Sequence, residues 1–119
     1  MTNRRALVVD DDDMMRRLVR TVLEADDFDV TEAANGADAL ALAVSTPPDV
    51  IVLDVMMPGL TGIDVLKQLD HANVKVVMLT ARVDPETEAK CREAGADAFL
   101  TKPFSSIELL DLIEDLIGE

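Results

Sequence analysis

The amino-acid sequence predicts an α/β fold, in which a doubly wound, five-stranded parallel sheet is covered by helices on both faces to give a three-layer sandwich. Short apolar runs alternate with amphipathic helical stretches along the chain, as expected of successive strand–helix–strand units. The chain has 119 residues, of which 49% are hydrophobic and 29% charged, so it can bury one core of ordinary size. We therefore predict a single domain that covers residues 1–119.

The first half of the chain is predicted to hold three strands, at residues 6–9, 30–33 and 50–53, with a helix after each of the first two. The first helix is expected to bury one stripe of residues: Met15, Leu18, Val19, Val22 and Leu23. Asn35-Gly36 is expected to begin the second helix, which Pro47-Pro48 ends. The residues expected to face inward from this second helix are Ala37, Leu40, Ala41 and Val44.

The second half is predicted to hold strands at residues 74–79 and 98–101 and three more helices. Each of these helices is preceded by a residue that can accept hydrogen bonds from the free N–H groups of a first turn: Thr61, Asp84 and Ser105. Gly95 is expected to end the fourth helix, because glycine readily adopts the left-handed conformation common at helix ends. Cys91 is expected to be a packed helix residue, and His71 to be solvated or to cap a helix.

Residues suited to phosphate chemistry follow four of the predicted strands. Asp10 and Asp11 come after the first strand, Asp54 after the third, Thr80 after the fourth, and Lys102 after the fifth. In an open parallel sheet the carboxyl ends of the strands line one crevice, so we expect these side chains to converge. The sequence therefore predicts a site made of an acid cluster, a hydroxyl and a lysine.

This set can hold a divalent cation beside a phosphoryl group. Carboxylate oxygens in small number favour Mg²⁺. We expect Asp11 and Asp54 to bind the ion directly, and Asp10 to lie next to these ligands without binding the ion itself. Asp54 is the best candidate for a nucleophile that forms an acyl phosphate, because it ends the central, most apolar strand. Lys102 can place its charge on the phosphoryl oxygens and Thr80 can donate a hydrogen bond to them.

The composition argues against several classes of partner. A formal net charge of −13 opposes direct binding to nucleic acid, which depends on Lys and Arg neutralising phosphates. No apolar stretch approaches the length that crosses a bilayer, and the first residues do not resemble a signal peptide. We therefore expect a soluble, cytoplasmic protein that contacts neither nucleic acid nor membrane.

Five stretches of the chain together resemble the receiver domain of two-component response regulators, including its chemotaxis-regulator-like members: LVVDDDDMMRRLVR, AANGADAL, PPDVIVLDVMMPGLTG, VVMLTA and GADAFLTKPF. The resemblance implies a flavodoxin-like (βα)5 fold. It also implies that Asp54 accepts a phosphoryl group from the phosphohistidine of a sensor histidine kinase or a histidine phosphotransfer protein. Mg²⁺ would lie on Asp11, Asp54 and the backbone carbonyl of Met56, with Asp10 orienting the site.

The resemblance further implies a conformational switch. Thr80 would move toward the phosphorylated aspartate while Phe99 swings inward, which would remodel the surface of the fourth helix, fifth strand and fifth helix for a downstream protein target or output domain. A cis peptide is expected before Pro103, and Met56 and Arg82 are expected to influence the lifetime of the phosphorylated form. Such a domain catalyses only its own phosphotransfer and autodephosphorylation. Because residues 105–119 contain no Lys or Arg, the intermolecular ion pairs of dimerising relatives could not form.

Four alternative functions share part of this pattern. A phosphatase of the haloacid-dehalogenase type would need an acid where Met56 stands, and a nucleotide switch would need a glycine-rich loop ending in Lys-Ser/Thr, which is absent. A flavodoxin-like electron carrier would need ring-stacking aromatic residues, whereas the chain has no Trp or Tyr. The fourth is a degenerate receiver that acts as a phosphorylation-independent protein-interaction module, and incorporation of a small phosphodonor distinguishes it from a working receiver.

Overall fold

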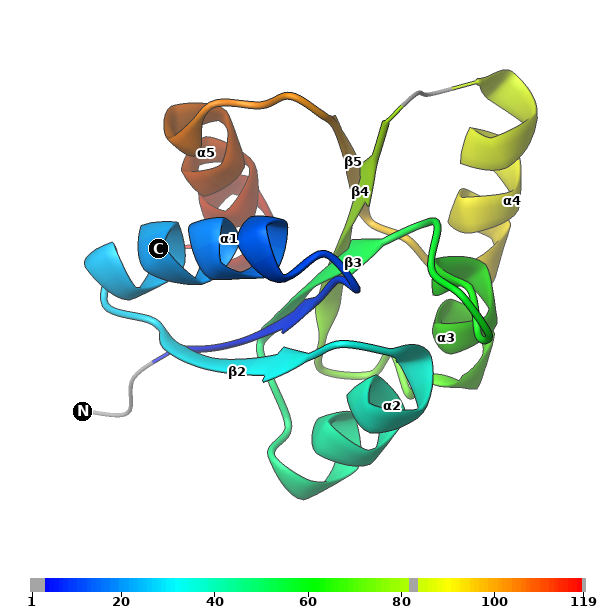
Figure 1. Cartoon of the computed structure of the whole chain (residues 1–119), viewed down its shortest axis with the longest axis horizontal. Helices are drawn as coiled ribbons and strands as arrows, with labels where there is room; N and C mark the ends of the chain where they lie inside the picture. The colour runs from blue at the N-terminus through cyan, green and yellow to red at the C-terminus, as the bar shows by residue number, and fades with distance from the viewer. Residues whose placement is uncertain (1–3, 82–83, 119) are drawn as a thin grey trace.

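The computed structural model describes residues 4–81 and 84–118, and within them five parallel strands alternate with five helices (Figure 1). The strands are β1 (Arg5–Val9), β2 (Asp29–Ala33), β3 (Val50–Asp54), β4 (Lys75–Thr80) and β5 (Ala98–Thr101). The helices are α1 (Asp13–Ala25), α2 (Gly36–Ser45), α3 (Gly62–Gln68), α4 (Pro85–Ala94) and α5 (Ser106–Ile117). The strand order is β2-β1-β3-β4-β5, which confirms the predicted doubly wound parallel sheet.

Helices cover both faces of the sheet, with α1 and α5 on one face and α2, α3 and α4 on the other (Figure 1). Alternate residues of each strand point to opposite faces. On β1, for example, Val8 packs with Val19 of α1 and Leu109 of α5, whereas Val9 packs with the opposite helices. Both faces of the central strands β1, β3 and β4 are therefore buried, which explains why these strands read as continuous apolar runs rather than alternating ones.

The register of the strands places their carboxyl ends side by side. Val9 of β1 pairs with Leu53 of β3, and Asp54 pairs with Leu79 of β4. The residues that follow Val9 and Leu79 therefore lie at the same edge of the sheet as Asp54. This alignment is the structural basis of the candidate site described below.

The predicted helix starts are confirmed by hydrogen bonds. Thr61 and Ser105 each form a reciprocal capping box with the acidic residue three places later, and Asp84 accepts from the backbone N–H of Thr87. Gly95 ends α4 with a left-handed φ of 114°, and a Cβ there would meet the ring of His71 at 2.5 Å. Nε2 of His71 lies 2.8 Å from the carbonyl oxygen of Leu66, so this histidine caps the end of α3.

The predicted inward faces of two helices need correction. Leu18 of α1 is 50% exposed, whereas Val19 and Leu23 are fully buried and Met15 and Val22 partly so. On α2, Leu40 is half-buried as expected, but three residues predicted to face inward are exposed: Ala37, Ala41 and Val44. The inward face is formed instead by Gly36, Ala39, Leu40 and Ala43.

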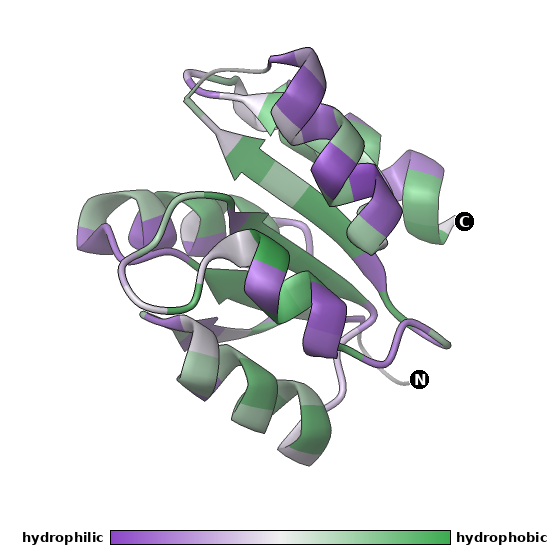
Figure 2. Ribbon diagram, turned by 90° about the vertical axis from the view of Figure 1, so that its right-hand side faces the viewer, coloured by the Kyte–Doolittle hydropathy of each residue, from purple (hydrophilic) through white to green (hydrophobic). Residues whose placement is uncertain are grey.

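The physical reason for the α2 error is composition. Asp38 is the only charged residue of this helix, so apolar residues occur on every side and their spacing does not define one buried stripe. Figure 2 shows the contrast, because α2 is green or pale along most of its length whereas α4 carries many purple residues. Packing against the sheet, rather than the pattern of the helix itself, decides which side of α2 is buried.

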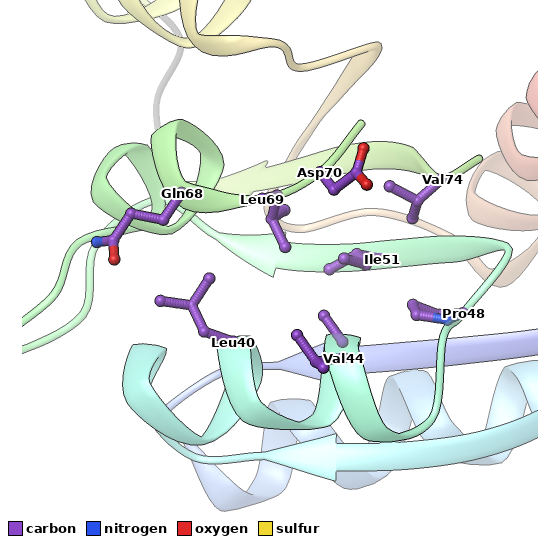
Figure 3. Close-up of a pocket in the computed structure, with 9 residues that line it drawn as sticks. Leu40, Val44, Pro48, Ile51, Gln68, Leu69, Asp70 and Val74 are labelled. Atoms are coloured by element: carbon purple, nitrogen blue, oxygen red, sulfur yellow. The ribbon is translucent and has the colours of Figure 1, made fainter. Parts of the chain in front are cut away.

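A pocket of about 200 Å³ lies where α2 and the segment after α3 meet the start of β3 (Figure 3). Its walls are largely apolar and include Leu40, Ile51 and Leu69, with Gln68 and Asp70 at one side. The pocket is near the amino ends of β3 and β4, so it is separate from the acidic edge. No described helix is long and apolar enough to span a membrane.

Candidate functional site

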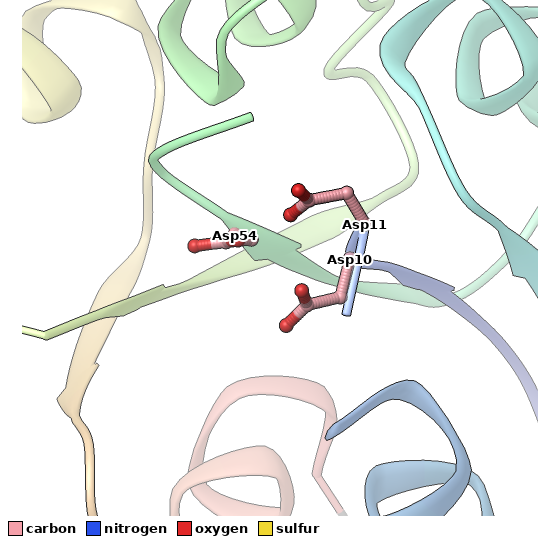
Figure 4. Close-up of side chains that lie close together, drawn as sticks. All are labelled: Asp10, Asp11 and Asp54. Atoms are coloured by element: carbon pink, nitrogen blue, oxygen red, sulfur yellow. The ribbon is translucent and has the colours of Figure 1, made fainter. Parts of the chain in front are cut away.

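The predicted acid cluster is present at the carboxyl edge of the sheet. Asp10 and Asp11 follow β1, Asp54 ends β3, and one carboxylate oxygen from each lies within 4.8 Å of the others. Figure 4 shows that all three side chains extend to the same side of the sheet edge. The parallel register brings together residues that are more than forty positions apart in the sequence.

Four successive aspartates in this loop have four different environments. Asp10 is 1% exposed, and its Oδ1 accepts a hydrogen bond of 2.9 Å from the N–H of Asp12. Asp12 is the N-cap of α1 and accepts from the N–H of Met14 at 2.9 Å, and Asp13 pairs with Arg16 at 2.7 Å. Within residues 4–81 and 84–118, Asp11 makes no side-chain hydrogen bond or ion pair. Its exposed carboxylate is therefore available to a ligand.

Asp54 is a buried carboxylate with two positively polarised neighbours. It is 5% exposed, and its Oδ1 lies 3.3 Å from the N–H of Met56 and 3.5 Å from Nζ of Lys102. Burial, followed by the nearby charge of Asp10, raises the pKa of Asp54 from 3.8 to about 6, although Lys102 and the Met56 N–H act in the opposite direction. At pH 7 the carboxylate form predominates, so this side chain is an available nucleophile.

Lys102 and Thr80 come to the same edge from β5 and β4. Nζ of Lys102 lies 3.4 Å from Oδ2 of Asp10, so one ammonium group approaches both buried carboxylates. The backbone N–H of Lys102 donates to the carbonyl of Thr80 at 2.7 Å, which fixes the loop after β5 to the end of β4. Thr80 is 5% exposed and directly follows Leu79, the β4 partner of Asp54. The expected cis peptide is found between Lys102 and Pro103.

Phe99 does not lie in the acid cluster itself. It pairs with Met78 on β4, two residues before Thr80, and its half-buried ring packs on the side of α2, α3 and α4. The guanidinium of Arg92 lies 5.0 Å from the centre of this ring. Met56 is 72% exposed beside the cluster, while Arg82 lies outside the described residues.

The donor set suits a hard divalent cation. Three carboxylates supply oxygen atoms only, and Mg²⁺ typically takes one or two such ligands and keeps several waters. Repulsion by the charge of Asp10 is one cause of the raised pKa of Asp54. A cation between the two carboxylates would relieve that repulsion. The residues present therefore fit Mg²⁺.

Arg16 was not among the residues predicted from the sequence. Its Nη1 donates to the backbone carbonyl of Asp10 at 2.9 Å, and its Nε donates to Glu32 of β2 at 2.8 Å. The available signal was weak, since it consisted only of a charged Glu32 inside a short strand that ends beside β1.

Comparison with known proteins decides the family. The model of the response regulator receiver domain matches residues 6–114, which is most of the chain. This chain belongs to the response regulator receiver domain family. The receiver domain is 38% identical to the transcriptional regulatory protein SrrA of Staphylococcus aureus over 112 residues, which cover 93% of this chain and 46% of SrrA. It therefore spans about half the length of the curated relatives it matches.

Solved structures agree with this assignment. The Vibrio cholerae chemotaxis protein CheY4 has a TM-score of 0.91 to this receiver domain at 33% identity, covering 96% of this chain and 98% of CheY4. The receiver domain of the Francisella response regulator 1452 has a TM-score of 0.88 at 38% identity, covering 97% of each chain. The receiver fold and the two-component family predicted from the sequence are both confirmed.

Proposed function

We propose that this receiver domain, taken as one unit over residues 1–119, accepts a phosphoryl group on Asp54 from a phosphohistidine. The observation that supports the proposal is a buried carboxylate at the end of β3 with the Lys102 ammonium 3.5 Å away and the Asp10 and Asp11 carboxylates beside it. An oxygen lone pair of Asp54 forms the new O–P bond. The electron pair of the P–N bond stays with the donor imidazole, which takes up a proton from water.

The other site residues stabilise charge on the transferred group. Lys102 neutralises the phosphoryl oxygens and Thr80 donates a hydrogen bond to them. Asp11, Asp54 and the backbone carbonyl of Met56 would hold Mg²⁺, while Asp10 orients Lys102 and the loop. When bound, Mg²⁺ supplies positive charge next to the phosphoryl oxygens. The same site hydrolyses the acyl phosphate, and we assign the domain no other catalysis.

The phosphodonor is a protein, a sensor histidine kinase or a histidine phosphotransfer protein. Large apolar side chains are exposed close to the acid cluster in sequence: Met14 and Leu18 on α1, and Met56 after Asp54. Exposed apolar residues beside a polar site suit a protein contact. The first two residues of α1 follow the N-cap Asp12 directly, so Met14 is at the same edge as the cluster.

The output is a change in the surface of α4, β5 and α5 that a downstream protein target or an attached output domain recognises. Thr80 and Phe99 are the switch residues. Thr80 ends β4, and Phe99 lies on β5, which pairs with β4. The net charge of −13 opposes direct nucleic-acid binding by this domain. We place the domain in the cytoplasm, with no membrane contact.

Labelling by a small phosphodonor tests the acceptor. Wild-type protein incubated with phosphoramidate and Mg²⁺ should gain the mass of one phosphoryl group, whereas Asp54→Asn and wild type with excess EDTA should gain none. Labelling of Asp54→Asn at the wild-type level would reject Asp54 as the acceptor. A wild-type protein that is never labelled, but still binds a partner, would instead be the phosphorylation-independent module.

Thermal unfolding tests the metal site separately. A ligand that binds only the folded state raises stability by about 1 to 3 kcal/mol at concentrations ten to a hundred times its dissociation constant. Mg²⁺ should therefore raise the Tm of the wild type and lose this effect in Asp11→Ala. Asp111→Ala, which removes an exposed carboxylate from α5, is the matched control and should respond like the wild type. Equal responses in all three proteins would place the metal elsewhere.

A further inference from the structure

The side chain of Arg16 joins three segments of the receiver domain. It is only 14% exposed, although it lies on a surface helix. Each of its three nitrogens has a different acceptor: the backbone carbonyl of Asp10 (2.9 Å), a carboxylate oxygen of Glu32 (2.8 Å) and a carboxylate oxygen of Asp13 (2.7 Å). The guanidinium therefore connects β2, the acidic loop and the first turn of α1.

Glu32 holds the arginine in place from the neighbouring strand. Its second carboxylate oxygen accepts a hydrogen bond from Arg20, which also pairs with Glu24 at 3.0 Å. The hydrogen bond to Arg20, followed by that to Arg16, lowers the pKa of Glu32, so the carboxylate stays ionised near neutral pH. Glu32 is thus a fixed anchor on β2 for two arginines of α1.

The contact of Arg16 with Asp10 reaches the acid cluster through the main chain. The N–H of Asp10 donates to Ala33 of β2 at 3.2 Å, and its carbonyl accepts from Arg16, so both backbone groups are fixed. The peptide that begins with this carbonyl leads directly to Asp11. A rotation of that peptide would change the direction in which Asp11 leaves the backbone, and would displace the Asp12 N–H that donates to the Asp10 carboxylate.

We propose that Arg16, anchored by Glu32, is a positioning residue that sets the direction of the Asp10 and Asp11 carboxylates and so the affinity of the site for Mg²⁺. This inference rests on the proposed function of the cluster. Arg16 touches neither the metal nor the phosphoryl group, and it acts through the backbone of Asp10. A lysine could keep the charge but could not reproduce three hydrogen bonds from one planar group.

The test is an NMR titration with Mg²⁺ on wild type, Arg16→Lys and Arg20→Lys. Residues that orient metal ligands typically contribute a factor of 10 to 100 in affinity, so Arg16→Lys should bind Mg²⁺ about tenfold more weakly. Arg20→Lys is the matched control, because Arg20 shares Glu32 but has no contact with the acidic loop among the described residues. Its affinity should stay within about twofold of the wild type, as for sites that are not coupled.

Two further readouts separate positioning from a general loss of structure. In the metal-free protein, the amide of Asp12, which bonds to Asp10, should exchange with solvent faster in Arg16→Lys than in Arg20→Lys. Saturating Mg²⁺ should restore the maximal rate of labelling by phosphoramidate in Arg16→Lys. Glu32→Gln should weaken Mg²⁺ binding in the same direction, and its effect should not add to that of Arg16→Lys.

The outcomes are distinct for the two proposals. No Mg²⁺ binding by the wild type would overturn the proposed function. Mg²⁺ binding that is equal in wild type and Arg16→Lys, or weakened equally by Arg16→Lys and Arg20→Lys, would overturn the positioning role and leave the proposed function standing.

Discussion

On three adjacent strands, β1, β3 and β4, the apolar interior of the sheet changes to its polar carboxyl edge from one residue to the next. Val9, Leu53 and Leu79 are completely buried and apolar, and the next residues, Asp10, Asp54 and Thr80, are almost equally buried but polar or charged. Burial of the apolar set stabilises the fold, whereas burial of the charged set costs free energy. The apolar strands therefore supply the stability that lets the edge keep two carboxylates close together.

The largest expected effect lies on the interior side. Leu53→Ala should lower the free energy of unfolding by about 3 kcal/mol, because it leaves a cavity among fully buried apolar side chains. Urea unfolding followed by far-UV circular dichroism measures this change. A loss below about 1 kcal/mol would mean that the sheet interior can collapse around the cavity, and the contrast with the edge would then be weaker.

Substitution of the next residue, Asp54, should change the free energy of unfolding in the opposite direction. Folding raises the pKa of Asp54 from 3.8 to about 6, so the folded state binds this proton more tightly than the unfolded state. The contribution of Asp54 to stability therefore falls as the pH rises from about 4 to 6, and above this range the full cost is present. Asp54→Asn should stabilise the metal-free protein at pH 8 by up to about 3 kcal/mol, the free energy that corresponds to this pKa shift.

Urea unfolding of both proteins between pH 4 and 8 in EDTA checks this prediction. The advantage of Asp54→Asn should shrink steadily below pH 6 and fall to about 0.5 kcal/mol at pH 4, where the aspartate is almost fully protonated in the folded state but only partly so in the unfolded state. An advantage that is independent of pH would show that the carboxylate charge is not its source.

The smallest effect is expected outside both regions. Leu18→Ser on the exposed side of α1 should change stability by no more than about 0.5 kcal/mol, as is usual for exposed positions. Val44→Ser, at a position of α2 that is 82% exposed, is the control. Only Leu18→Ser should slow phosphorylation by a cognate histidine kinase, and neither variant should alter labelling by phosphoramidate. A similar loss in both would remove the proposed docking role of α1.

The sequence predicted the strands and helix starts well because their signals are local. An apolar run bounded by turn residues defines every strand except β2, and a Thr, Asp or Ser before a helix can only satisfy the N–H groups next to it. The acid cluster was predictable for a related reason. Its members end parallel strands, and any parallel sheet aligns those ends whatever the remaining sequence.

Features that depend on packing between elements could not be predicted. The buried side of α2 is chosen by the sheet beneath it, and Ala37, Ala41 and Val44 are exposed although they are as apolar as their neighbours. The contact of Arg16 with Glu32 joins residues whose proximity follows from the pairing of β1 with β2 and from the path of α1. Neither helix periodicity nor a motif contains that information.

The ion pair between Lys102 and Asp10 sets the order in which the site can assemble during synthesis on the ribosome. Synthesis proceeds from the amino end, so the acidic loop and β3 leave the ribosome well before the lysine that compensates them. Until β5 adds to the sheet beside β4, the nascent chain holds its carboxylates without their ammonium partner. The acid cluster therefore gains its ammonium partner only after β5 has been synthesised, more than forty residues after Asp54.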